Sequence, residues 1–118
     1  MEIPDEPDDI LGLGIYRRIK TVTEISPDFK KFVDNLNENI LLSTDYYDFM
    51  IKFKDENFEV TREIENPTII IKIKIEEFFK IMEKRTSMVF SFLKGKMKFK
   101  KGLTKLFKVY KLFGNILS

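Results

Sequence analysis

The sequence of 118 residues contains neither cysteine nor histidine. Without cysteine there is no disulfide framework and no thiolate chemistry, and without histidine a His-based catalytic triad and a conventional zinc site are excluded. No apolar run approaches the roughly 20 residues that a membrane-spanning helix needs. The chain opens with Glu2, Asp5 and Glu6, where a secretory signal would carry positive charge. We therefore expect a cytoplasmic protein with no metal site and no cofactor.

Acidic residues are missing from the last third of the chain. Residues 84–118 hold 10 Lys and Arg and no Asp or Glu, whereas residues 1–83 hold 11 Lys and Arg against 19 Asp and Glu. The two segments therefore carry net charges of +10 and −8. Such asymmetry marks a nucleic-acid or membrane face in some proteins, and in others the basic segment docks beside the acidic one. The hydrophobic content of 43% is sufficient for one folded domain.

Helical patterns dominate the first third of the chain. Residues 1–9 are acidic and contain two prolines, which predicts an extended tail. Residues 10–23 have apolar side chains at helical spacing but also two glycines, which predicts a short helix or an ordered arm. A clearer helix start follows, because Ser26 can cap a helix and Pro27 suits its first position. Apolar residues at helical spacing then predict a helix over residues 27–41.

A β-hairpin is predicted over residues 46–54 and 58–64. Aromatic and aliphatic side chains alternate with polar ones along both segments, as in strands with one buried face. The two apolar faces coincide if Phe53 lies opposite Val60, which leaves Glu56 and Asn57 as a two-residue turn. The expected sheet has one apolar face and one charged face.

The clearest strand covers residues 68–75, where isoleucines alternate with Lys72 and Lys74. A helix opens at Glu76 and Glu77, since acidic residues suit the positive end of a helix. A second, shorter helix is expected around Phe92. Lysines then alternate with apolar residues over 96–100, which predicts a further strand. Residues 103–118 predict a basic amphipathic helix.

The order of these motifs is specific. A turn at Asn66-Pro67 leads into an apolar strand, a helix contains Glu77-Phe78-Phe79, and Phe92 shortly precedes a strand that begins Gly95-Lys96-Met97-Lys98. This arrangement resembles the sterol carrier protein type 2 domain, and the likeness spans residues 28–113. The sequence departs from the family pattern at Lys84, where a glycine is usual after the helix. It departs again at Lys101, because the glycine that ends the strand comes one residue later, as Gly102.

The resemblance implies an α+β fold: a curved, mainly antiparallel sheet of about five strands, covered on one face by helices, with an apolar tunnel between the layers. It also implies non-catalytic binding or transport of a hydrophobic ligand, such as a fatty acid, acyl-CoA, phospholipid or sterol-like lipid. Large apolar side chains and flexible methionines suit such a site, although ordinary core packing is the alternative for each of them. The expected ligand-binding residues are Phe78, Met82, Met88, Phe90, Phe92, Met97, Phe99, Leu103, Leu106, Phe107 and Tyr110. We divide the chain into a tail and arm over residues 1–23 and a single domain over residues 24–118.

The last helix has more apolar surface than one packing contact requires. One stripe comprises Leu103, Leu106, Phe107, Tyr110, Phe113 and Leu117, and an adjacent stripe comprises Val109, Leu112 and Ile116. One stripe can pack on the sheet. The other requires a lipid, a second subunit, a membrane surface or the N-terminal arm.

Other functions are less well supported by the sequence. Carboxylates such as Glu76 and Glu77 have no obvious nucleophile or metal-ligand partner, so we expect no catalytic residues and no enzyme activity. The alternative function is a basic interaction module that binds nucleic acid or an anionic membrane surface through residues 84–111. Strand alternation, however, points Phe99 away from the neighbouring lysines, so base stacking and phosphate contact would not share a surface. We expect no specific nucleic-acid partner, at most weak contact with an anionic membrane, and a monomer or homodimer.

Overall fold

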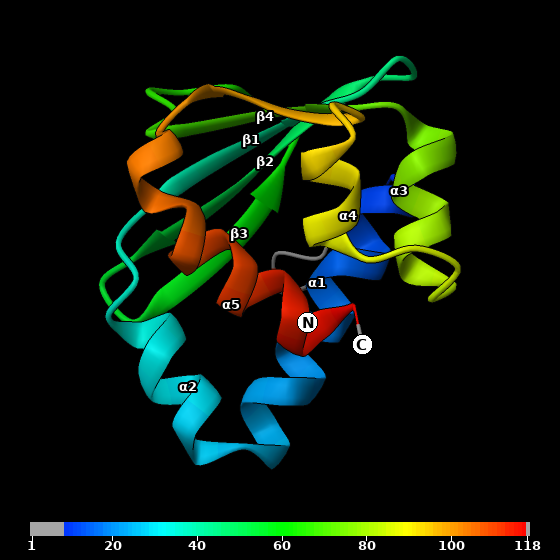
Figure 1. Ribbon diagram of the computed structural model, residues 1–118. Coiled ribbons are helices and arrows are strands. Elements are labelled where there is room, and N and C mark those ends of the chain that lie inside the picture. Colours follow the sequence, from blue (N-terminus) through cyan, green and yellow to red (C-terminus); the bar gives the residue numbers. More distant parts are fainter. Residues whose placement is uncertain (1–8, 118) are drawn as a thin grey trace.

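The computed structural model describes residues 9–117 (Figure 1). The helices are α1 (Ile10–Ile25), α2 (Pro27–Asp34), α3 (Ile75–Met82), α4 (Met88–Leu93), the short 3₁₀ helix η1 (Leu103–Lys105) and α5 (Leu106–Ile116). The strands are β1 (Asn39–Ser43), β2 (Asp48–Lys54), β3 (Asn57–Thr61), β4 (Ile69–Ile73) and β5 (Met97–Lys101). Of the predicted tail, residues 1–8 lie outside the described part. No helix within residues 9–117 is both long and apolar enough to cross a membrane.

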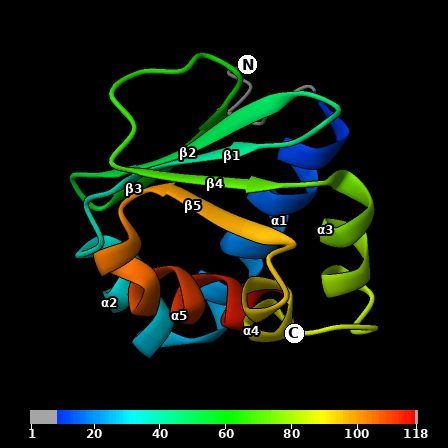
Figure 2. The ribbon, with the colours of Figure 1, turned by 45° about the horizontal axis from the view of Figure 1, so that its top comes forward.

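The five strands form one sheet in the order β3-β2-β1-β4-β5. Neighbouring strands are antiparallel except for the parallel pair β1 and β4. Figure 2 shows the helices on one face of this sheet, with the segment that joins β3 to β4 running over the other face. The predicted α+β class and its mainly antiparallel sheet are confirmed.

Helix α1 is the predicted arm, and it packs beneath the sheet. The Asp9 carboxylate caps it, since Oδ2 accepts from the Gly12 backbone N–H at 2.7 Å and from the Tyr47 hydroxyl at 2.6 Å. Ile15 and Ile19 are fully buried in the same core as the inner face of the sheet. The two glycines therefore did not prevent a helix of 16 residues, because burial outweighs their low helix propensity.

The helix predicted over residues 27–41 ends at Asp34, and the prediction was wrong beyond it. Asn37 adopts a left-handed backbone conformation with φ 49°, which turns the chain away from the helical path. Ile40 then belongs to β1, which lies between β2 and β4. Leu41 on the outer face and Leu42 on the inner face are both buried, so β1 lacks the alternation that identifies a strand.

The hairpin is present, but its predicted register was wrong by two residues. Phe53 pairs with Phe58, and Ile51 takes Val60 as its partner. Asp55 and Glu56 form the turn with φ values of 54° and 63°, the left-handed pair that a tight two-residue hairpin requires. A shift of two residues keeps each side chain on its face, so the inner face is apolar as expected.

Strand β5 has one extra residue opposite the step from Ile70 to Ile71 of β4. Ile70 pairs with Lys101 and Ile71 pairs with Phe99, so Lys100 is bulged out of the ladder. Gly102 follows with φ 82°, and a Cβ there would lie 2.7 Å from the Thr68 carbonyl oxygen. A glycine therefore suits this position, which is one residue later than in the family pattern.

Candidate functional site

A buried carboxylate fixes the last helix to the sheet. Glu38 precedes β1, and each of its carboxylate oxygens lies 2.8 Å from a lysine ammonium, Oε1 from Lys105 and Oε2 from Lys108. The Thr68 hydroxyl also donates to Oε1 at 2.7 Å. Burial opposes ionisation, but these three hydrogen bonds outweigh it and lower the pKa of Glu38 from 4.5 to about 2. We call these contacts of Glu38 with Lys105, Lys108 and Thr68 the Glu38 clamp, and it holds α5 in one orientation about its axis.

In this orientation α5 presents its two stripes to different surroundings. Val109, Leu112 and Ile116 are buried against the core. In the other stripe, Phe113 and Leu117 are buried, but Leu103, Phe107 and Tyr110 are half exposed or more. The helix therefore packs through one stripe, and the outer part of the other is left open beside α4. The prediction that the second stripe needs another partner is consistent with this geometry.

A second buried carboxylate braces α3 and α4. Glu77 on α3 accepts a hydrogen bond from the Ser91 hydroxyl on α4, and both side chains are buried. The ammonium of Lys96, the residue before β5, lies 4.0 Å from the same carboxylate. Together these contacts hold α4 in front of the sheet.

A pocket of about 530 Å³ opens between the end of α3, α4 and α5. Its lining is apolar toward the core, and the polar residues Lys84, Thr86 and Ser87 also line it. Lys84, at the rim, has φ 62° in the turn after α3, the position where glycine is usual in the resembling family. The lining residues are Ile81, Lys84, Thr86, Ser87, Met88, Tyr110, Phe113, Gly114 and Leu117.

The pocket floor continues into the space between α5 and the sheet. Ile81, Met88, Phe113 and Leu117 line both the pocket and this inner space, whose other walls include Phe78 and Met97. The inner space has a volume of about 10 Å³. That is about enough for one water molecule. Between the described residues, side chains therefore fill the region where an open apolar tunnel was expected.

The structure separates the predicted site residues into groups. Phe78 and Met97 line the inner space, Tyr110 lines the outer pocket, and Met88 lines both. Phe92 and Phe99 pack edge-to-face with ring centroids 5.7 Å apart, and they are partly buried, as are Met82 and Leu106. Phe90, Leu103 and Phe107 lie at the surface and line neither space. Phe107 is 83% exposed, so its expected place in an internal wall was wrong.

Several lining residues were not among the predicted ones. Phe113 and Leu117 follow Tyr110 at helical spacing, and that signal was sufficient to include them. Lys84 and Ser87 carried no apolar signal, because they belong to the polar rim. Leu42 lies on β1, a strand that the sequence pattern did not predict.

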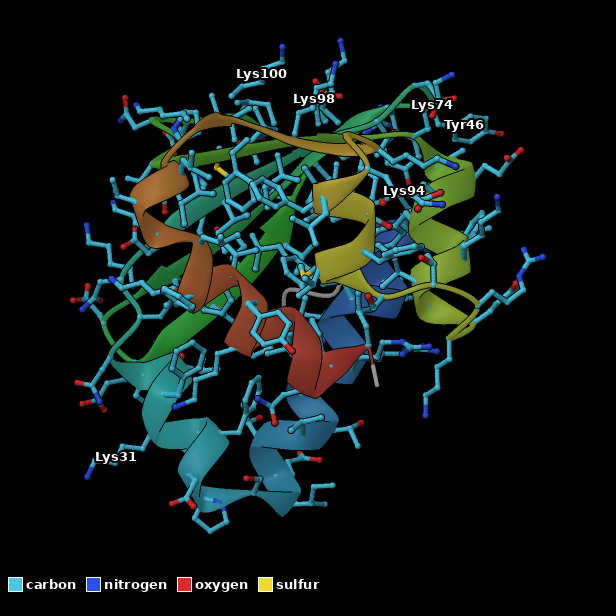
Figure 3. The ribbon with its side chains drawn as sticks, viewed as in Figure 1. Lys31, Tyr46, Lys74, Lys94, Lys98 and Lys100 are labelled. Atoms are coloured by element: carbon cyan, nitrogen blue, oxygen red, sulfur yellow. The ribbon has the colours of Figure 1, made fainter. Side chains whose placement is uncertain are left out.

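The outer face of the sheet carries a different kind of surface. Lys72 and Lys98 lie opposite each other there, and Lys98 and Lys100 point away from the helices (Figure 3). A broad polar groove of about 900 Å³ includes these three lysines. Phe99 lies on the inner side, packed on Phe92, so the expected separation of the aromatic ring from the strand lysines is confirmed. Within residues 9–117 no group of His, Cys, Asp or Glu side chains is arranged to hold a metal ion.

No family model matches the sequence, and none of the curated proteins matches it either. Solved structures do match. Sterol carrier protein 2 from Yarrowia lipolytica in its apo form aligns with a TM-score of 0.68 and 12% identity, over 99% of this chain and 97% of that chain. The UbiJ-SCP2 ubiquinone synthesis protein aligns with a TM-score of 0.70 and 12% identity, over 87% and 92%. Sterol carrier protein domain 2 of Helicoverpa armigera aligns with a TM-score of 0.67 and 13% identity, over 94% of both chains. The chain therefore has the sterol carrier protein 2 fold, and the resemblance seen in the sequence is confirmed at that level.

Proposed function

We propose that this protein binds a hydrophobic small molecule with an anionic end, such as a fatty acid, in the pocket between α4 and α5, and releases it unchanged. The observation that carries the proposal is the pocket itself, whose apolar floor opens toward the core and whose rim carries Lys84. Its volume of about 530 Å³ lies within the range of small-molecule sites. The structural neighbours named as sterol carrier proteins support the same class of function.

The lining residues suit an alkyl chain. Tyr110, Phe113 and Leu117 provide an apolar wall along one side of α5, and Met88 faces them from α4. Methionine is unbranched and adapts to irregular shapes, so Met88 is suited to move as a chain enters the inner space beneath it. Each methylene buried there contributes about 0.8 kcal/mol.

The rim suits a carboxylate head. No carboxylate of the described residues lies within ion-pair distance of the Lys84 ammonium, so its charge is available to a ligand. Thr86 and Ser87 add hydroxyl donors beside it. The pocket lining contains no Asp or Glu that would activate these hydroxyls as nucleophiles, which supports binding without chemistry.

The test is titration of the purified protein with a fluorescent long-chain fatty acid. Gly114 lines the pocket, and a Cβ built on it meets no atom within 4 Å, so this position has room for a side chain and we expect Gly114→Leu to obstruct the pocket. Affinity should fall at least tenfold. Gly14→Leu is the matched control, because Gly14 is also a helical glycine with open space around its Cβ but lies on α1. This control should bind like the wild type.

Two results would contradict the proposal. One is a wild-type protein that binds no fatty acid, acyl-CoA or lysophospholipid in solution. The other is a Gly114→Leu variant that binds as tightly as the wild type, since the ligand would then occupy another place.

A further inference from the structure

We propose that the surface formed by α4 and the open stripe of α5 docks on an anionic lipid bilayer. We define this α4–α5 surface by its exposed apolar residues Phe90, Leu93, Leu103, Phe107 and Tyr110. Each of them is at least half exposed, and Leu93 and Phe107 are 72% and 83% exposed. Figure 1 shows α4 and α5 beside each other, with no other element in front of them. The exposed apolar residues are therefore concentrated on two neighbouring elements.

The charge of this region identifies the partner. Residues 84–118, which contain the whole α4–α5 surface, have no Asp or Glu. The Lys94 ammonium lies 4.5 Å from the centre of the Phe90 ring. Lys111 belongs to α5, and its ammonium lies 4.9 Å from the centre of the Phe32 ring on α2. Within residues 9–117 neither lysine has a carboxylate at ion-pair distance. Exposed aromatic and aliphatic side chains, together with lysines that lie over aromatic rings and have no carboxylate partner, match the interface of an anionic membrane, which takes the apolar groups below the headgroups and the ammonium groups among them.

Two other occupants fit less well. A second copy of the chain would bring two acid-free basic segments together, with like charges facing across the interface. Nucleic acid would leave Leu93 and Leu103 without a partner, because bases stack on aromatic rings and not on aliphatic side chains. The lysines best placed for a polyanion alone, Lys98 and Lys100, point from the outer face of the sheet, away from the α4–α5 surface (Figure 3).

The test is flotation of the full-length protein with vesicles of phosphatidylcholine, with or without about 30 mol% phosphatidylserine. The wild type should bind only the anionic vesicles, and added salt should weaken binding. The double variants Phe90→Ser/Leu93→Ser on α4 and Lys94→Glu/Lys111→Glu should each lower the partition coefficient roughly tenfold. Phe107→Ser on α5 should also lower the partition coefficient. This single variant tests the proposal even if a double variant fails to fold.

The control variant is Lys98→Glu/Lys100→Glu, which changes the net charge by the same amount on the outer face of the sheet. It should bind anionic vesicles nearly as well as the wild type. The proposal is wrong if this control loses binding as strongly as Lys94→Glu/Lys111→Glu, or if Phe90→Ser/Leu93→Ser binds normally. Binding of an RNA oligonucleotide at physiological salt that depends on Lys98 and Lys100, without vesicle binding, would replace the membrane with a nucleic acid.

Membrane docking does not depend on the proposed ligand pocket, so each of the two proposals can be disproved without the other. Gly114→Leu should lose fatty-acid binding in solution and keep vesicle binding, whereas Phe90→Ser/Leu93→Ser should show the reverse. Loss of vesicle binding in Gly114→Leu would show that the vesicle signal comes from lipid in the pocket, and the docking proposal would then be wrong.

Discussion

Helices α1 and α5 lie on the same side of one sheet, yet their apolar side chains differ in how far they are exposed to solvent. Leu11, Ile15, Tyr16 and Ile19 of α1 are all buried, and the exposed apolar residues of this helix, Ile10 and Ile25, lie at its two ends. Helix α5 buries Val109, Leu112 and Ile116 but leaves Phe107 and Tyr110 open to solvent. The Arg18 guanidinium joins the two helices, since Nη1 donates to the Ile116 carbonyl oxygen at 3.0 Å.

The difference shows that the exposed apolar surface does not result from a shortage of core. The sheet already has a complete inner layer, in which Ile69, Ile71 and Phe53 are fully buried. The extra apolar residues are concentrated where the sequence also has no acids. Both helices therefore contribute buried side chains to one core, and the α4–α5 side has in addition exposed apolar residues that are available for binding. Stability and binding measurements should accordingly respond to different residues.

The largest expected effect is the loss of a buried side chain on α1. Ile19→Ala should lower the free energy of unfolding by about 2 to 4 kcal/mol, because it deletes methyl groups in a filled core. Phe107→Ala removes a larger side chain but should change stability by less than about 0.5 kcal/mol, because that ring is already in water. Urea denaturation of both variants measures the contrast. Equal losses would mean that Phe107 packs in solution.

The next effect concerns the clamp that holds α5. The pKa of Glu38 is about 2 in the folded protein, against 4.5 for an ordinary glutamate, so the folded state binds this proton less readily. Its contribution to stability is fully present above pH 4.5 and is lost as the pH falls through about 2. The two lysines are partly exposed, so we expect about 1 to 3 kcal/mol and not the full value of the pKa shift. Urea denaturation between pH 7 and pH 2 should show this loss in the wild type and a flatter profile in Glu38→Gln.

Glu65 provides the matched control for Glu38. It pairs with Lys52 at 2.6 Å, and this ion pair lowers its pKa, but the Glu65 side chain is 69% exposed. An exposed ion pair contributes about 0 to 1 kcal/mol. Glu65→Gln should therefore leave the pH dependence nearly unchanged. A large effect here, together with a small one at Glu38, would show that the buried clamp does not fix α5.

The sequence predicted the secondary structure well wherever one face of an element was buried and the other was exposed to solvent. Strand β4 alternates the buried Ile69, Ile71 and Ile73 with the half-buried Ile70 and the exposed Lys72, and its position was predicted to within one or two residues. Strand β1 was not predicted, because both of its faces are covered and its sequence does not alternate between apolar and polar residues. On its outer side, Leu41 and its partner Met50 are buried on the face over which the segment joining β3 to β4 runs (Figure 2). That covering depends on tertiary structure and leaves no local pattern.

The candidate site was less predictable than the fold. The two stripes on α5 were visible in the sequence, but which one faces the core depends on the clamp between Glu38, Lys105 and Lys108. These residues are up to 70 positions apart in sequence, and no local pattern couples them. The hairpin register failed for a local reason, since Asn57 was favoured as the left-handed residue and Asp55 and Glu56 adopt that conformation instead.

The smallest expected effect separates stability from binding at a single residue. Lys84 has a left-handed backbone at the end of α3, where its N–H donates to the Ile81 carbonyl oxygen at 3.1 Å. Glycine adopts this conformation without the steric cost that a Cβ brings, so Lys84→Gly should raise the free energy of unfolding by about 0.5 kcal/mol. The same change removes the ammonium group from the pocket rim and should weaken fatty-acid binding. Glu56→Gly relieves the same strain in the hairpin turn, far from the pocket, and should raise stability while leaving binding intact. If Lys84→Gly stabilises the protein and binds fatty acid like the wild type, Lys84 does not hold the ligand's anionic end, and the head of the ligand lies elsewhere on the rim.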